Sequence, residues 1–231
     1  MELKGRLKLI TEKIPKCDSL CDVGTDHAYI PIFSIENKIC IKAIASDVRI
    51  GPLEIAKENI RLAGLKDKIE TRLGGGLQPI RDGEVDTYVI AGMGGVLICD
   101  ILKESYNKAQ SAKTIILQPM NAIEILREWL LKNGFEIVDE ELTSEGEKIY
   151  NVIVCKWTGT IVREPEIYYY VGRRLIERKD PLLATFLEKK LKQTNTILKE
   201  MKNIREESVD SVSKYEYLRD NYVMLLRDRI D

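Results

Sequence analysis

The sequence has few of the residues that build metal centres and disulfide frameworks. It contains one histidine, His27, and five cysteines, none of them in a CxxC pair. A structural zinc site needs about four such ligands at short spacing, so we expect no metal site. An odd number of scattered cysteines predicts free thiols in a cytoplasmic protein.

Long apolar segments are also missing. The longest apolar stretch, Thr87 to Cys99, contains three glycines and is shorter than the roughly 18 residues that a membrane-spanning helix needs. The first residues mix both charges, which is not the apolar core of a secretory signal. We therefore expect no membrane segment and a cytoplasmic location.

The net charge of −1 over 231 residues gives no preference for nucleic acid as a partner. The distribution of charge is uneven, because residues 163–205 hold eleven Lys or Arg against six Asp or Glu, and residues 206–231 hold four against seven. A basic surface stripe is compatible with a neutral protein. A solvated helix face explains the same charges equally well.

The first part of the chain alternates strand and helix patterns, which predicts a parallel sheet covered on both faces. Strands are expected over Ser19–Val23, Ala43–Asp47, Ile69–Leu73, Thr87–Ala91, Thr114–Gln118, Phe135–Leu142 and Ile149–Lys156. Helices are expected over Glu2–Ile14, Tyr29–Glu36, Leu53–Ala63, Val96–Asn107 and Ala122–Asn133. The last two strands are separated by only a short polar turn, so we predict an antiparallel hairpin there.

The chain after Trp157 has a different pattern, with more charge and no strands. Asp180 before Pro181 is typical of a helix start, and two apolar stripes at helical spacing follow, with Arg205–Ser208 between them. The prediction is an α/β, Rossmann-like domain of seven strands over residues 1–160. A small all-α, antiparallel coiled-coil-like domain over 161–231 follows it.

Glycines and acids follow the predicted parallel strands, where an open α/β sheet binds its ligand. The loops contain Asp22 to Ala28, Ser46 to Arg49, Gly74 to Leu77, Gly92 to Gly95, and Gln118-Pro119. Four of these five loops contain glycine or an acid, and four such loops at one edge of a sheet indicate a binding site.

Two classes of ligand fit a glycine turn followed by an acid 25 positions later, from Asp22 to Asp47. A dinucleotide requires bare backbone against its pyrophosphate, as in GxGxxG. Here Asp26 stands at the second glycine position, and a carboxylate there repels phosphate. S-adenosylmethionine carries an ammonium and a sulfonium, which carboxylates attract, so we favour this methyl donor.

The segments Asp22 to Pro31 (DVGTDHAYIP), Ala91 to Gly95 (AGMGG), Leu117 to Pro119 and Arg127 to Leu130 (REWL) resemble the bacterial tRNA adenine N1-methyltransferases that modify position 22. That family joins a class I methyltransferase domain to a helical, coiled-coil-like domain, and the resemblance covers essentially the whole chain. In two places the sequence departs from the family pattern: Gly74–Gly76 lacks the expected acid, and Met120 replaces a polar residue.

The resemblance implies an S-adenosylmethionine-dependent enzyme with tRNA as its substrate. It assigns most of the cofactor contacts to the strand-end loops and Asp26 to catalysis. The implied cofactor residues are Asp22, Gly24, Asp26, His27, Asp47, Val48, Gly75, Gly76, Leu77, Ala91, Gly92 and Met93.

The missing Asn- or Asp-Pro-Pro-aromatic loop after the fourth strand argues against methylation of an exocyclic amine. Ring N1 of adenine has an in-plane lone pair and needs alignment more than deprotonation. Methylation there makes the base cationic, and Asp26 is the candidate carboxylate to stabilise it and accept a proton. The base must first turn out of its stack.

Other interpretations remain open at this stage. Asp22 also suits a role as a cap of the following turn, Asp26 suits a helix-capping role, and His27 suits a buried structural role. The tyrosines at 168–170 are expected to pack against the helical pair. Two other functions fit the pattern: a small-molecule methyltransferase whose helices serve dimerisation, and a non-catalytic scaffold built on a cofactor fold. We expect a monomer.

Overall fold

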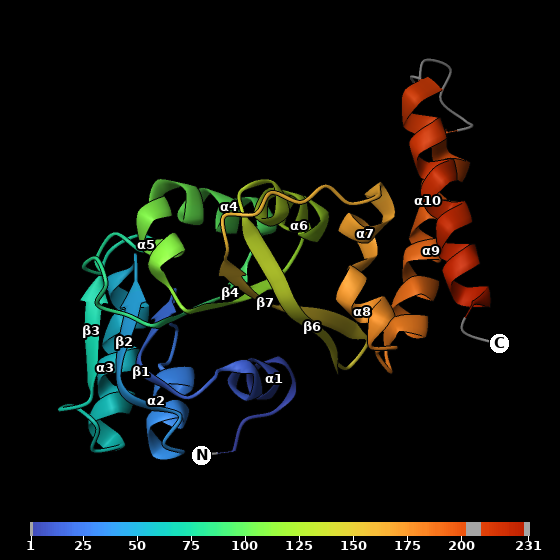
Figure 1. Cartoon of the computed structure of the whole chain (residues 1–231). Coiled ribbons are helices and arrows are strands. Elements are labelled where there is room, and N and C mark those ends of the chain that lie inside the picture. The colour runs from blue at the N-terminus through green and yellow to red at the C-terminus, as the bar shows by residue number, and fades with distance from the viewer. Residues whose placement is uncertain (1, 202–208, 229–231) are drawn as a thin grey trace. The chain divides into compact units, whose positions relative to one another are not determined.

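The computed structural model describes residues 2–201 and 209–228, which form two compact units, 1–164 and 165–231. The first unit contains a seven-stranded sheet (Figure 1). Its strands are β1 Cys17–Val23, β2 Cys40–Asp47, β3 Ile69–Leu73, β4 Thr87–Met93, β5 Thr114–Pro119, β6 Phe135–Glu145 and β7 Lys148–Trp157. Its helices are α1 Gly5–Lys13, α2 Tyr29–Glu36, α3 Ile50–Leu62, α4 Gly95–Glu104, α5 Tyr106–Ser111 and α6 Ile123–Lys132.

The strand order is β3-β2-β1-β4-β5-β7-β6. The first five strands are parallel, whereas β7 pairs antiparallel with both β5 and β6. This confirms the predicted α/β fold and the terminal hairpin. The chain winds outward in opposite directions from β1 and β4, so the carboxyl ends of these two neighbours form the topological switch point where such folds bind ligands.

Alternation along the central strands builds two apolar layers. On β4, Tyr88 and Ile90 pack into the core that contains α4 and α6 side chains, while Val89 packs into the core that contains α1, α2 and α3 side chains. Successive side chains of a strand point to opposite faces. A strand buried on both faces is therefore mostly apolar, as the buried run from Tyr88 to Ile90 of β4 is.

The expected helix over Val96–Asn107 is interrupted at Ser105, which leaves helical geometry with φ −119° and ψ 44° and separates α4 from α5. The hydroxyl of Tyr106 donates to the carbonyl of Asn133 at 2.6 Å, which ties the start of α5 to the end of α6. Helical periodicity continues through this point, so the sequence alone did not reveal the break.

The second unit is helical, with α7 Glu166–Val171, α8 Arg173–Glu177, α9 Leu183–Met201 and α10 Val209–Arg227. The Asp180 carboxylate accepts a hydrogen bond from the backbone N–H of Leu182 at 2.9 Å, as expected for a residue that precedes a helix. The long helices α9 and α10 pack against each other. The turn expected at Arg205–Ser208 lies outside the described residues.

Within the described residues, none of the helices has the length and apolar composition that crossing a bilayer would require.

Candidate functional site

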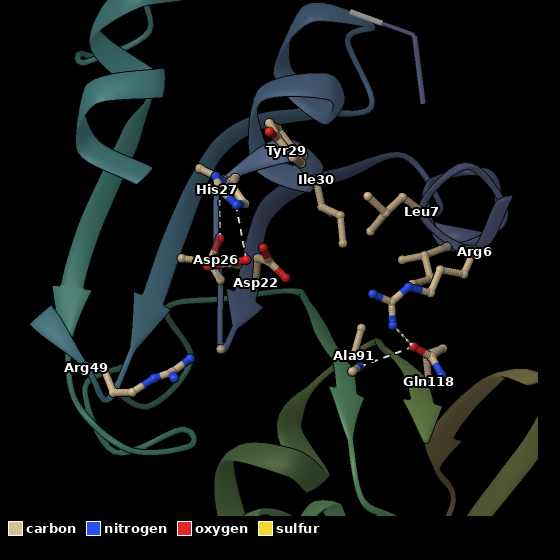
Figure 2. Close-up of a pocket in the computed structure, with 15 residues that line it drawn as sticks. Arg6, Leu7, Asp22, Asp26, His27, Tyr29, Ile30, Arg49, Ala91 and Gln118 are labelled. Atoms are coloured by element: carbon tan, nitrogen blue, oxygen red, sulfur yellow. Dashed lines mark hydrogen bonds and ion pairs between the residues drawn. The ribbon is translucent and has the colours of Figure 1, made fainter. Parts of the chain in front are cut away.

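A cavity of about 410 Å³ lies at the carboxyl edge of the sheet, bounded by the loop after β1, the end of β4 and helix α1 (Figure 2). Ligand sites commonly fall between 300 and 1,000 Å³, so the volume suits a small molecule or a single base. Six of the residues proposed from the sequence line it: Asp22, Gly24, Asp26, His27, Ala91 and Gly92. The other lining residues are Arg6, Leu7, Ile10, Thr25, Ala28, Tyr29, Ile30, Arg49 and Gln118.

The turn after β1 needs glycine. Gly24 has φ +76°, a conformation that residues with a Cβ rarely adopt. The backbone N–H groups of Gly24 and Thr25 both donate to the carbonyl of Ser46 at 2.8 Å, which fixes the turn against the end of β2. The Thr25 hydroxyl then accepts from the N–H of Ala28 at 3.2 Å, so the loop has a defined shape before α2 begins.

Asp22 is buried at the end of β1 and still lines the cavity. Burial, with a smaller contribution from the charge of Asp47, raises the pKa of its carboxyl to about 6, although a hydrogen bond with Thr25 acts in the opposite direction. A desolvated carboxylate is stabilised by a positive charge placed beside it. The site therefore favours a cationic ligand group at this point.

Asp26 and His27 occupy the mouth of the cavity. The Asp26 carboxylate lies 3.1 Å from Nε2 of His27, and its side chain is 67% exposed. The His27 ring stacks on Tyr29 with centroids 4.9 Å apart and an interplanar angle of 11°. Asp26 accepts no backbone hydrogen bond among the described residues, so a helix-capping role has no support, and its carboxylate is accessible to a substrate.

The floor of the cavity is formed at the end of β4, where the pairing with β5 shifts between Ala91 and Met93. Gly92 adopts φ +76°, and its N–H donates to Oε1 of the fully buried Gln118 at 3.2 Å. The same Gln118 oxygen accepts from Nη1 of Arg6 at 3.3 Å (Figure 2). Helix α1 is thereby joined to the floor.

The other predicted cofactor residues lie outside the lining of this cavity. Asp47 is buried at the end of β2, and its Oδ1 accepts the N–H of Arg49 at 2.7 Å. The N–H of Gly74 donates to the carbonyl of Asp47 at 2.9 Å, which brings the glycine loop after β3 beside β2. Val48 is 68% exposed next to them.

Four predicted residues remain, and three of them face the protein interior to different degrees. The fourth, Gly75, lies in the loop after β3, where its carbonyl accepts the N–H of Gln78 at 3.1 Å. Gly76 has φ +53° and approaches Ile101 closely, and Leu77 is fully buried in the core. The methyl group of Met93 lies over Gly24, where a Cβ would be only 2.2 Å from it. A Cβ on Gly24 would displace only the flexible end of Met93, so the positive φ, more than the packing, requires glycine here.

Sequence reasoning missed several lining residues. Tyr29 and Ile30 belong to the DHAYI segment after the first predicted strand, and Gln118 ends another predicted strand. The position of all three at strand ends could therefore have identified them. Arg6 had no such signal, since it is one of several charges on an N-terminal helix, and only the tertiary structure brings it to Gln118.

The carboxylates near Gly24 suit the positively charged methionine end of S-adenosylmethionine and disfavour a pyrophosphate at that turn. Two carboxylates, Asp22 and Asp26, line the cavity, and Asp47 lies buried one strand away. Gly24 lines the cavity with its backbone, because it has no side chain. Within residues 2–201 and 209–228, no three His, Cys, Asp or Glu side chains are placed to bind a metal.

Comparisons with known proteins show the family to which the chain belongs. A family model described as a methyltransferase domain matches residues 3–153. The tRNA (adenine(22)-N(1))-methyltransferase of Bacillus subtilis (strain 168) is 39% identical over 157 residues, which are 68% of this chain and 66% of that protein.

Two solved structures match along nearly their whole length. The B. subtilis M1A22 tRNA methyltransferase TrmK has a TM-score of 0.84 and 31% identity, with 100% of this chain and 99% of that chain covered. M. capricolum TrmK in complex with S-adenosyl-homocysteine has a TM-score of 0.82 and 26% identity, with 100% and 99% covered. The chain therefore belongs to the methyltransferase-domain family and, within it, to the group of the tRNA m1A22 methyltransferases.

Proposed function

We propose that this protein transfers a methyl group from S-adenosylmethionine to N1 of the adenine at position 22 of tRNA. The observation that carries the proposal is the cavity at the ends of β1 and β4, with buried Asp22 and exposed Asp26 on its walls. The B. subtilis relative, which matches over the full length of this chain, supports this substrate, because it is named an M1A22 tRNA methyltransferase.

The cofactor is held by two groups of residues in this proposal. Asp22 and Gly24 contact its charged methionine end, together with Asp26 and His27, while the floor of the cavity separates it from the base. Asp47 binds the ribose hydroxyls. The floor is formed by Ala91, Gly92 and Met93. The adenine end of the cofactor is contacted by Val48, Gly75, Gly76 and Leu77. When bound, the cofactor supplies a methyl group on a positively charged sulfur.

The side chains of the protein act mainly by alignment and electrostatics. N1 of adenine has a lone pair in the plane of the base, so no residue has to deprotonate it first. N1 methylation leaves the base positively charged, and the exposed Asp26 carboxylate stabilises that charge and accepts a proton from the exocyclic amine. A flipped base reaches this carboxylate, because Asp26 lies at the mouth of the cavity.

The helical unit contributes to tRNA binding in this proposal, since it carries the basic residues of the C-terminal part of the chain. They are Arg173, Arg174, Arg178, Lys179, Lys189, Lys190 and Lys192. Phosphate contacts of this kind give a steep dependence of affinity on salt. Replacing the three α9 lysines of this set by alanine should weaken tRNA binding and flatten its salt dependence, with cofactor affinity unchanged.

The decisive experiment follows methyl incorporation from labelled S-adenosylmethionine into an unmodified tRNA transcript. The matched control is the same transcript with guanine at position 22. Incorporation into the first transcript alone, mapped to N1 of adenine 22, is the expected result. Cofactor binding without incorporation into any tRNA would contradict the proposal and favour a small-molecule methyltransferase. Absence of cofactor binding would favour a scaffold.

In the same proposal, the protein acts in the cytoplasm and is a monomer. All five cysteines have free thiols in the structure, which suits a reducing compartment. Light scattering coupled to size exclusion should give one chain mass, and a dimer mass would correct this part of the proposal without affecting the chemistry.

A further inference from the structure

Arg6 is the basic side chain of the cavity that lacks an acidic partner among the described residues. His27 lies 3.1 Å from the Asp26 carboxylate, and Arg49 lies 3.7 Å from Asp47. The half-buried Arg6 guanidinium instead donates from Nη1 to neutral Gln118 and to the sulfur of Met120. Its Nε and Nη2 have no hydrogen-bond partner within the described part of the chain.

The helix that carries Arg6 is fixed to the sheet. Lys13, at the other end of α1, contacts the carboxylates of Asp139 and Glu141 on β6, each at 2.6 Å. The backbone N–H of Arg6 donates to the carboxylate of Glu145 at 2.7 Å. The guanidinium carbon lies 5.4 Å from the centroid of the Tyr150 ring. Arg6 therefore presents its free N–H groups from a defined position.

The charges of the cavity are separated in space. Figure 2 shows the Arg6 guanidinium reaching from α1 toward Gln118 and Ala91, across the cavity from Asp26 and His27. A guanidinium with unpaired donors in a half-buried cavity forms strong, charge-assisted hydrogen bonds with an oxyanion. The acids of the cavity accept the positive part of a ligand, and Arg6 is placed to accept the negative part.

We propose that Arg6 is the oxyanion-binding residue of this cavity. Its ligand is either the carboxylate at the methionine end of the cofactor or a phosphate of the tRNA backbone next to the target adenine. The inference rests on the proposed function for the identity of the anion. It concerns binding, so it is tested without turnover.

The test compares two variants of the full chain with a matched control. Arg6→Gln removes the charge and keeps a polar side chain, whereas Arg6→Lys keeps the charge and loses the planar fork. Lys8→Ala is the control, because Lys8 lies on the same helix with a 61% exposed side chain outside the cavity lining. Thermal melting of each variant checks that the fold is retained.

The first arm measures S-adenosylhomocysteine and 5′-methylthioadenosine by calorimetry. The second compound lacks the amino-acid end and therefore the carboxylate. If Arg6 binds the carboxylate, Arg6→Gln weakens S-adenosylhomocysteine binding by about tenfold to a hundredfold, Arg6→Lys weakens it less, and 5′-methylthioadenosine is unaffected. Lys8→Ala matches the parent for both compounds.

The second arm measures tRNA affinity against salt concentration. If Arg6 binds a phosphate, S-adenosylhomocysteine affinity is unchanged, tRNA affinity falls in Arg6→Gln, and the slope of log K against log salt decreases in magnitude by about 0.7 to 0.9. Either pattern supports the proposal and identifies the anion.

Two results would overturn it. One is an Arg6→Gln variant that matches the parent in both arms. The other is an equal loss for S-adenosylhomocysteine and 5′-methylthioadenosine, which would mean that Arg6 acts only by holding Gln118 and the floor. Failure of the proposed function would give a different result, because the parent protein itself would then bind no cofactor or would methylate no tRNA.

Discussion

Asp22 should make cofactor binding depend on pH. Burial raises the pKa of its carboxyl from 3.8 to about 6, so the ligand-free protein holds a proton on Asp22 at pH 5 and has lost it at pH 7.5. A cationic ligand group beside the carboxylate favours the ionised form and lowers this pKa again. Binding is therefore coupled to loss of a proton.

The magnitude follows from linkage. At pH 5, one unit below a pKa of about 6, only about a tenth of the ligand-free protein has the ionised Asp22 that the ligand requires. With a pKa near 4 or below in the complex, affinity for S-adenosylmethionine falls by about tenfold between pH 7.5 and pH 5, which is about 1.4 kcal/mol.

Calorimetry with S-adenosylmethionine in the absence of tRNA measures this directly. Titrations at pH 7.5, 6 and 5, in two buffers with different ionisation enthalpies, give both the affinity and the number of protons released. The control is Asp22→Asn, which has the same shape and no ionisation, and its affinity should vary little with pH. A flat profile for the parent, or the same pH dependence in Asp22→Asn, would refute the reasoning.

The same pKa shift determines the sign of a stability effect in the ligand-free protein. Between about pH 4 and pH 6 the native state holds a proton on Asp22 that the unfolded chain has lost, so stability falls as pH rises through this window. The full effect is about 3 kcal/mol above pH 6. Asp22→Asn should therefore be more stable than the parent at pH 7.5 and about equally stable at pH 4, as measured by urea denaturation.

Three further predictions concern catalysis and packing. Asp26→Ala should keep its melting temperature, since the side chain is 67% exposed, and should still bind the cofactor. At saturating cofactor it should lose about a hundredfold or more in single-turnover rate; an unchanged rate would remove Asp26 from the mechanism. Arg127 and Glu140 form a buried ion pair at 2.8 Å, so Arg127→Ala should cost about 3 to 5 kcal/mol in urea denaturation. Replacing both by apolar residues should cost less than the sum of the single changes. Gly95→Ala places a Cβ 2.3 Å from a backbone carbonyl oxygen and should destabilise the protein by at least about 1 kcal/mol. The control Gly51→Ala, in a helix with nothing within 4 Å, should be neutral or stabilise it by up to about 1 kcal/mol; equal melting temperatures for both glycine variants would contradict this packing argument.

Local patterns of apolar residues and turn residues in the sequence predicted most of the fold. The predicted bounds of α2 and β3 agree with the structure, and the terminal hairpin formed as its short connection required. Periodicity reports which side chains are buried, so it identifies elements well. It reports less about where a helix is interrupted, because Ser105 changes the backbone without changing the apolar pattern.

Sequence patterns alone were enough to predict the fold class, the edge of the sheet that carries the cavity, and the two acids, Asp22 and Asp26, that line it. Parallel strands bring their carboxyl ends to one edge, so Asp22, Gly24 and Gly92 had to meet there once the strands were identified. Which of the predicted residues line the cavity depends on how the helices and strands pack, and so does the contact between Arg6 and Gln118, which are 112 residues apart in the sequence. The physical reason is that strand order and helix docking are set by burial of side chains over the whole domain, and no local spacing encodes a contact between two such distant residues.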